Sequence, residues 1–266
     1  MQVSARRPGR REQGWPAPTP QRRRLRPCYA LRAMELDHVV ILVNDLDAAT
    51  RQWSGDGFTV TPGGVHADGL THNALICFAD GSYIELLAFR TAAPTTHRWE
   101  RLRPFPGPID YAVAVSDLPT FAQQAMERGL RYSPVTEGGR QRPDGVTIRW
   151  RLSWPPPDAE GLPFLIEDLT PRELRVPAGD NRRHANGAQG IAELTLAAND
   201  LSRTVRDLTT LFGAAADESG AFVMGKMLLR VRRPAQGYEA ALIARRGCGP
   251  VSLAIALARG ETRHFC

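Results

Sequence analysis

Three copies of one short phrase constrain the fold of this chain more than any other feature. Segments 36–46, 109–118 and 191–201 read LDHVVILVNDL, IDYAVAVSDL and IAELTLAANDL. Each is apolar enough to form a buried strand and ends in Asp-Leu ahead of a helix-like stretch, whose first turn the Asp side chain can cap. A repeat of this kind predicts three copies of one supersecondary unit.

Further strands complete each unit. Apolar or alternating segments, bounded by Gly, Pro and Asp, follow every predicted helix. We place them at 58–61, 72–80 and 82–89, at 132–135, 146–154 and 162–169, and at 221–225, 226–233 and 251–258. The element order is therefore βαβββ three times, which predicts an α+β fold.

One βαβββ unit cannot bury both faces of its own sheet. We therefore expect the first two units, within residues 34–170, to pair around a shared cleft with an apolar interior. The third, degenerate module, residues 190–260, is then left without a mate. It either pairs with its counterpart in a homodimer or packs against the edge of the first pair.

The basic charge of the chain lies outside these units. Residues 1–33 carry nine arginines and one glutamate, a formal charge of +8, whereas the whole chain carries +6, which leaves −2 for residues 34–266. Prolines and arginines without apolar periodicity predict a disordered tail. This tail is a dispensable extension, an arm that contacts anionic partners or a transit peptide, and we expect no nucleic-acid partner for the folded body.

The sequence argues against several functional classes. No apolar run reaches the roughly 18–20 residues that span a bilayer, so we expect no membrane partner. The four cysteines lack CxxC spacing, which indicates reduced thiols and a cytoplasmic location. The Gly-Gly pairs at 63–64 and 138–139 are interpreted as turns without the lysine of a phosphate loop, and the GxSxG, GxGxxG and HExxH motifs are absent.

A histidine and a glutamate stand out on the strands of the first unit. Because side chains alternate along a strand, His38 shares a face with Val40, and Glu85 shares one with Tyr83. If the two strands are neighbours, both groups project into one cavity, where an ionised carboxylate needs a partner. Three interpretations remain open: a site for zinc, iron, manganese or nickel, a hydrogen-bonded pair that stabilises the core, and a proton-transfer pair.

The order and spacing of these pieces resemble a known family. The βαβββ repeat, the opening LDHVVILVNDLDAA and the middle PGGVHADGLTHNALICFADGSYIELLAF are similar to the glyoxalase/bleomycin-resistance/extradiol-dioxygenase superfamily, also called vicinal oxygen chelate proteins. Within it, the pattern PGG-H…N-x-L…Y-x-E-L resembles the glyoxalase-like domain family over residues 35–170. The resemblance implies a cleft that holds one divalent metal, with ligands from the first and last strands of each paired unit.

The resemblance also implies roles for particular residues. Carried over by position, it makes His38 and Glu85 metal ligands in the first unit and assigns Tyr111 and Glu167 to the matching positions of the second. Tyr111 stands where the family usually has His or Gln, which implies a metal site that is incomplete or differently built, and the resemblance gives Glu167 as the ligand of that unit. Facing the cleft, Tyr111 could donate a hydrogen bond or act as an acid, and we expect Glu85 and Tyr111 to be the catalytic groups.

Four further residues are expected at the rim of the cleft as substrate-binding groups. They are His66, His72, Asn73 and Trp99. Either histidine could supply a third metal ligand, although a loop histidine is also often simply solvated. Asn73 could orient a substrate oxygen or close a turn, and Trp99 could stack on a substrate ring or pack in the core.

Together these expectations favour a metal-dependent enzyme of the lyase, isomerase or dioxygenase type that acts on a small oxygenated organic molecule. The alternative is a metal-free protein that binds such a molecule and sequesters it, as resistance members of the superfamily do. Fold alone does not decide between them, because one fold hosts many functions.

Overall fold

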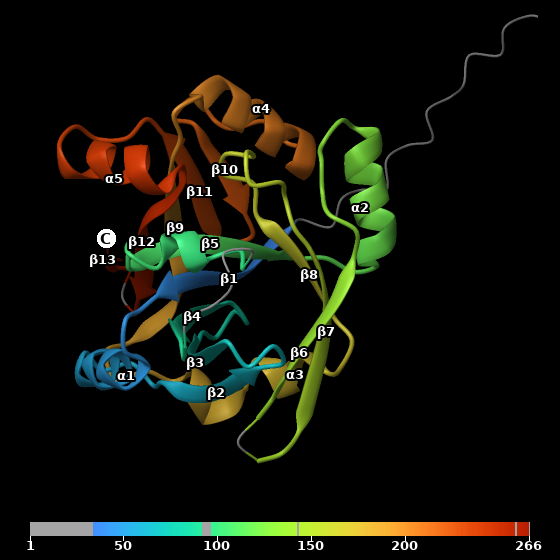
Figure 1. The fold of residues 1–266 in the computed structure, drawn as a ribbon. Helices are drawn as coiled ribbons and strands as arrows, with labels where there is room; N and C mark the ends of the chain where they lie inside the picture. Colours follow the sequence, from blue (N-terminus) through green and yellow to red (C-terminus); the bar gives the residue numbers. More distant parts are fainter. Residues whose placement is uncertain (1–33, 92–96, 143, 259, 266) are drawn as a thin grey trace, which may run out of the picture. The chain divides into compact units, whose positions relative to one another are not determined.

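Eight strands close into a barrel made by the first two repeats. The computed structural model describes residues 34–91, 97–142, 144–258 and 260–265 (Figure 1), so the predicted tail at 1–33 lies outside the described residues. The first module consists of β1 (Glu35–Leu42), α1 (Leu46–Gly55), β2 (Thr61–His66), β3 (Thr71–Cys77) and β4 (Tyr83–Phe89). The second consists of β5 (Gly107–Ala114), α2 (Leu118–Glu127), β6 (Thr136–Gln141), β7 (Thr147–Ser153) and β8 (Phe164–Asp168). Both are βαβββ units, as predicted.

The strand order of the barrel is β1-β4-β3-β2-β6-β7-β8-β5. In each module the last strand runs parallel to the first, β4 beside β1 and β8 beside β5. The modules join twice, where β1 pairs antiparallel with β5 and where β2 pairs antiparallel with β6. The predicted shared cleft is therefore the interior of one closed barrel.

The repeated Asp-Leu ending does what its position predicts. Asp45 accepts a hydrogen bond from the backbone nitrogen of Ala48 at 2.8 Å, and Asp200 accepts one from Arg203 at 2.9 Å. Asp117 caps α2 in the same way, from a left-handed backbone conformation with φ of 59°. Each cap satisfies amides of a first helical turn that would otherwise lack partners.

The third module is degenerate, as predicted, but its strand order differs from a third βαβββ unit. It consists of β9 (Ala188–Ala197), α4 (Leu201–Phe212), β10 (Ala221–Met224), β11 (Met227–Arg232), α5 (Tyr238–Arg246), β12 (Gly249–Leu257) and β13 (Thr262–Phe265). Only two strands follow α4 before a helix intervenes, and the sheet order is β10-β11-β9-β12-β13. β12 pairs antiparallel with β9 on the side away from β11, in the place that β5 takes beside β1.

The sheet of the third module lies against the outside of the barrel. In Figure 1 it is drawn in orange and red behind β1 and β5, and β12 contacts β5. One apolar cluster includes Val39 and Ile84 from the outward faces of β1 and β4 together with Leu194, Leu253 and Ile255 of the third module. The third module thus packs against the first pair within a single chain, but on the outer face of a closed barrel and not at the expected edge.

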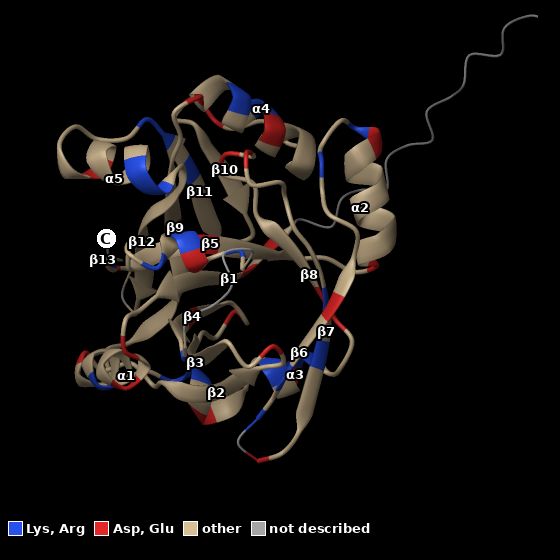
Figure 2. Ribbon diagram, viewed as in Figure 1, with Lys and Arg blue, Asp and Glu red and all other residues tan. Residues whose placement is uncertain are grey.

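The segments between modules contain short helical turns. They are η1 (Glu100–Leu102) before β5, and α3 (Arg172–Arg175) and η2 (Gly179–Arg182) before β9. Figure 2 shows the basic residues of α3 in blue close to β6. In the described part of the chain, no helix is long and apolar enough to cross a membrane.

Candidate functional site

A cavity of about 280 Å³ lies inside the barrel. Its polar side comes from the first module and from β6, and its apolar side comes from β7 and β8. The side chains that matter below are His38, His66, Asn73, Tyr83, Glu85 and Arg140 on the polar side, and Trp150, Leu152, Phe164 and Ile166 on the apolar side.

A β-bulge in β1 aims His38 into this cavity. The pairing of β1 with β5 shifts by one residue between Leu36 and His38, which leaves Asp37 as the extra residue. A bulge changes the direction of the side chains beside it. Here it brings the side chains of two consecutive residues together, with His38 Nδ1 2.6 Å from Asp37 Oδ1. Because an ionised carboxylate only accepts, Nδ1 donates, and Nε2 is the nitrogen that faces the cavity.

Glu85 lies between two histidines. Its Oε2 atom is 3.4 Å from His38 Nε2, and its Oε1 atom is 3.5 Å from His66 Nε2. Asn73 Nδ2 donates a hydrogen bond to Glu85 Oε1 at 2.6 Å. Burial raises the pKa of Glu85, but the contact with His38, the charge of His66 and the Asn73 hydrogen bond outweigh it and hold the pKa at about 2. The carboxyl group is therefore ionised.

The two imidazoles differ electrostatically. Burial lowers the pKa of His38, but its contacts with the Asp37 and Glu85 carboxylates outweigh burial, so the pKa is raised. Burial lowers the pKa of His66, and the positive charge of Arg140 adds to this effect. His66 Nδ1 lies 2.7 Å from Thr71 Oγ1, so in both histidines a second side chain holds Nδ1 while Nε2 faces Glu85.

The Gly-Gly pair of β2 makes room for this polar side. It lies within a strand and not in the predicted turn, as does the pair in β6. A Cβ atom on Gly63 would come within 1.9 Å of Asn73 Oδ1 and 2.2 Å of Arg140 Nη1. Gly64 has a φ of +126°, and a Cβ there would lie 2.3 Å from the Gln141 carbonyl oxygen. Only glycine permits the close approach of β2 to β3 and β6.

Arginines of α3 form hydrogen bonds to residues that adjoin His38, and the sequence analysis did not predict this network. Arg175 of α3 donates to Asp37 Oδ1 and to Asp168 Oδ2, both at 2.8 Å, and to the Tyr83 hydroxyl at 2.8 Å. Asp37 is fully buried, and the Arg175 and Arg172 charges outweigh that burial and hold its pKa well below the usual range. Asp37 and Arg175 are 138 residues apart, so no local pattern in the sequence indicated that they pair.

Two residues of the second module that were expected in the site, Tyr111 and Glu167, lie outside the cavity. The Tyr111 hydroxyl donates to the Gly161 carbonyl oxygen at 2.7 Å, and its ring packs in the cluster between barrel and third module. Glu167 accepts from the backbone nitrogens of Asp117 and Leu118, both at 3.2 Å, and so supports the first turn of α2. The expectations that Tyr111 faces the cleft and that Glu167 reaches the metal position are both wrong.

The bulge in β1 explains this correction. His38 pairs with Ala112 across the two modules, and Ala112 lies beside Phe164 in β8 as His38 lies beside Tyr83 in β4. The counterpart of His38 is therefore Ala112, one residue beyond Tyr111. A shift of one residue moves a side chain to the opposite face of a sheet. By the same register Ile166 is the counterpart of Glu85.

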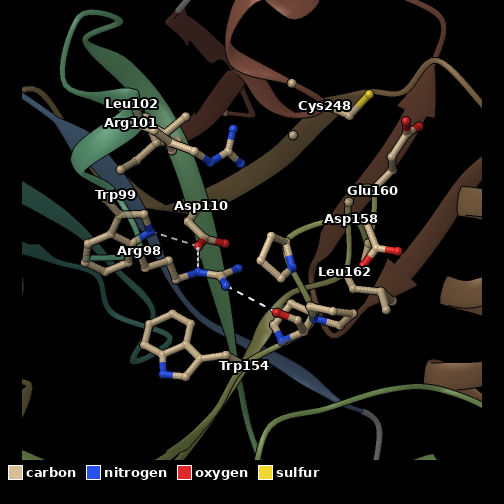
Figure 3. A pocket seen from close by; sticks show the side chains of 18 of the residues that line it. Arg98, Trp99, Arg101, Leu102, Asp110, Trp154, Asp158, Glu160, Leu162 and Cys248 are labelled. Atoms are coloured by element: carbon tan, nitrogen blue, oxygen red, sulfur yellow. Dashed lines mark hydrogen bonds and ion pairs between the residues drawn. The ribbon is translucent and has the colours of Figure 1, made fainter. Parts of the chain in front are cut away.

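Of the remaining two predicted rim residues, His72 does not line the cavity and Trp99 does. His72 lies between Thr71 and Asn73, which both line the cavity, and alternation along β3 turns its side chain the other way. Trp99 does line the cavity, together with Trp154, but both also line a second cavity of about 940 Å³. Figure 3 shows that second cavity, where Trp99 Nε1 and Arg98 Nε both donate to Asp110 Oδ2, at 3.0 and 3.1 Å.

The side chains around Glu85 have the chemistry of a metal site, although not its compact spacing. Among the described residues, no group of three or more His, Cys, Asp and Glu side chains is arranged to hold a metal ion as it stands. Two imidazole nitrogens and a carboxylate on one side of a cavity are nevertheless the donor set of 2-His-1-carboxylate sites. Second side chains that hold Nδ1, as Asp37 and Thr71 do, are also typical of metal-binding histidines. The donor set therefore fits a divalent metal.

Comparisons with known proteins agree with the fold. A family model described as a glyoxalase-like domain matches residues 36–212. A crystal structure of a hypothetical protein from Staphylococcus aureus is similar, with a TM-score of 0.65 and 15% identity over 88% of this chain and 99% of that one. No curated protein sequence matches the chain.

Two further structures show partial similarity. A xylose isomerase-like TIM barrel/4-hydroxyphenylpyruvate dioxygenase fusion protein has a TM-score of 0.52 and 17% identity over 84% of this chain and 36% of its own. Methylmalonyl-CoA epimerase from Mycobacterium tuberculosis has a TM-score of 0.40 and 25% identity over 51% of this chain and 89% of its own. At 15% and 17% identity, the Staphylococcus aureus structure and the fusion protein support the fold alone.

Proposed function

Because the chain belongs to the glyoxalase-like domain family, we propose that it is an enzyme that uses one divalent metal to transform a small oxygenated organic molecule. The reaction is of the lyase, isomerase or dioxygenase type. One observation carries the proposal: His38 Nε2 and His66 Nε2 face the two oxygens of the Glu85 carboxylate, at 3.4 and 3.5 Å, inside the barrel cavity.

In this proposal His38, His66 and Glu85 hold the metal. Imidazole and carboxylate donors suit zinc, iron, manganese or nickel. When bound, such a metal supplies a Lewis acid that polarises a substrate oxygen and stabilises negative charge on it. Asp37 keeps the His38 proton on Nδ1, and Asn73 holds one oxygen of Glu85 through a 2.6 Å hydrogen bond.

The rest of the cavity selects a small molecule. Its volume of about 280 Å³ lies just below the range of about 300–1,000 Å³ that is usual for ligand pockets. Trp150, Phe164 and Ile166 form an apolar wall that packs on the substrate and excludes water from the polar side. Exclusion of water strengthens the electrostatic interactions in the site.

A metal-free binding protein is the second candidate. The side chains around Glu85 already satisfy one another by contacts among themselves, and no group of three donors in the described residues has the spacing of a formed metal site. In this candidate the same cavity would sequester a small molecule, and His38 with Glu85 would form a polar pair that binds it.

Metal analysis tests the two candidates. The purified chain is loaded in turn with zinc, iron(II), manganese or nickel, dialysed and analysed for bound metal. We expect about one ion per chain, and its loss in His38→Ala, His66→Ala and Glu85→Gln. Glu167→Gln is the matched control and should keep the metal, because Glu167 lies at the start of α2. Wild-type chain that retains none of the four metals would favour the binding protein.

A further inference from the structure

Arg140 is a buried cation whose hydrogen-bond partners are all neutral. It lies in β6 on the wall of the barrel cavity, and only 4% of its surface is exposed. Nη1 donates to Asn73 Oδ1 at 2.8 Å, and Nη2 donates to the backbone oxygen of Arg175 at 2.9 Å. Its Nε atom is buried without any hydrogen-bond partner.

The neighbouring Arg175 is a buried arginine with its charge paired. Arg175 is equally buried, and it forms ion pairs with the carboxylates of Asp37 and Asp168. In the part of the chain that the structure describes, Arg140 forms no ion pair. Burial of a guanidinium without a counter-ion is costly, because the charge loses its hydration and gains no compensating anion.

The fold nevertheless builds space for this side chain. Gly63 lacks the Cβ that would come within 2.2 Å of Arg140 Nη1, and Asn73 links the guanidinium to Glu85 through its two amide ends. Arg140 therefore stands one side chain away from the group proposed to hold the metal. The Glu85 carboxylate acts on Arg140 only across Asn73, so a cation kept at this place without a directly paired anion fits a ligand that brings one.

We propose that Arg140 binds the carboxylate of the substrate, so that the substrate is a small organic acid with a second oxygen beside its carboxyl group. A guanidinium presents several N–H donors in one plane and matches a carboxylate in charge and shape. The second oxygen then points toward His38, His66 and Glu85. This placement of the second oxygen rests on the proposed metal function, whereas the anion subsite at Arg140 does not.

Pairs of probes that differ only in charge test the subsite in the wild-type chain. Pyruvate and phenylpyruvate, each beside its primary amide, are titrated by calorimetry into metal-free protein in EDTA and into zinc-loaded protein. We expect each acid to bind about 10- to 100-fold more tightly than its amide. Amides that bind as well as the acids in both forms, acids that do not bind in either form, or inorganic phosphate that binds more tightly than the acids would each overturn the inference.

Substitutions locate the effect on Arg140. Arg140→Gln should abolish the preference for the acids, and Arg140→Lys should keep part of it, because an ammonium retains the charge but not the planar set of donors. Arg149→Gln is the matched control: it removes the same charge from an exposed side chain of β7 that pairs with Glu137. Acid binding by Arg140→Gln equal to that of wild type would contradict the assignment. If Arg140→Gln does not fold, the lysine variant and the wild-type probe pairs decide the question.

Metal content, measured on the same preparations, separates the two proposals. Protein that binds acids through Arg140 but never retains metal would keep the anion subsite and overturn the metal-dependent function. Protein that retains one metal but shows no preference for acids over amides would do the reverse.

Discussion

The two halves of the barrel share one backbone plan and differ in what they place inside it. In the first half the paired positions of the first and last strands hold His38 and Glu85, whereas in the second half they hold Ala112 and Ile166. The first half thus supplies the histidines and the glutamate, and the second half supplies an apolar wall together with Arg140 of β6. The comparison teaches that apolar periodicity maintains the fold of a repeat, while two or three side chains decide whether that repeat has a chemical role.

A second difference concerns an aspartate of each first strand, one residue before His38 in β1 and two residues before Ala112 in β5. Asp37 in β1 and Asp110 in β5 are each paired with an arginine from the segment that follows a module, Arg175 after β8 and Arg98 after β4. Arg175 is 3% exposed and joins two carboxylates, whereas Arg98 is 29% exposed and pairs with one. The same arrangement is therefore deeply buried on the polar side of the barrel and partly solvated on the other.

The largest expected effect on stability comes from removing the arginine that pairs with the aspartate in each half. Arg175→Met leaves Asp37 and Asp168 with only the partly exposed Arg172 as an arginine partner, and we expect it to lower the free energy of unfolding by about 3 kcal/mol. Arg98→Met should cost less, about 1–2 kcal/mol, because Arg98 is partly exposed and Trp99 still donates to Asp110. Urea denaturation of the two variants measures the difference. Equal losses would show that the two halves do not differ in this respect.

The glycines of β2 and β6 test the same contrast at the cavity. A Cβ on Gly63 would meet Asn73 and Arg140, whereas a Cβ on Gly138 would meet the Trp150 indole at 2.5 Å. Both Gly63→Ala and Gly138→Ala should destabilise by about 1–3 kcal/mol, since a well-packed interior resists added volume. Only Gly63→Ala should also reduce the preference for an acid over its amide, because Arg140 and not Trp150 recognises the charge. Titration of both variants with phenylpyruvate and its amide checks this, and an equal preference in the two variants would contradict the assignment of the anion subsite to Arg140.

The smallest effect concerns the glutamate of the second half. Glu167→Ala removes a carboxylate that accepts from two amides at the start of α2, and loss of such a cap typically costs about 1 kcal/mol. Thermal unfolding should register this loss, while metal content and acid binding stay at wild-type levels. A variant that lost metal would restore Glu167 as a ligand.

Local patterns in the sequence carried the prediction of much of the fold. The repeated phrase predicted the two βαβββ modules, the degenerate third module and the Asp caps, because strand burial and capping depend on residues close together in the chain. Alternation along β4 also predicted that Glu85 shares the inner face with Tyr83. The recognised superfamily, which the family match supports, rested on the same local pieces.

The second half of the site could not be predicted in this way. Aligning the repeats by their letters set Tyr111 opposite His38, but the bulge at Asp37 adds a residue to β1 and makes Ala112 the true counterpart. No local signal marked that bulge. The assignment in β8 was also displaced by one residue: Glu167 was assigned to the position that Ile166 occupies.

By itself, the sequence determined the modules and their caps, since each depends on short-range periodicity. It also placed His38 and Glu85 on the first and last strands of one module, but the fold made those strands neighbours. Only the tertiary structure decided the bulge, the placement of the third module and the roles of Arg140 and Arg175. Arg140 meets Asn73 across 67 residues and Arg175 meets Asp37 across 138. Charge pairing of this kind depends on which strands become neighbours when the barrel closes, and that is a property of the whole fold rather than of any segment.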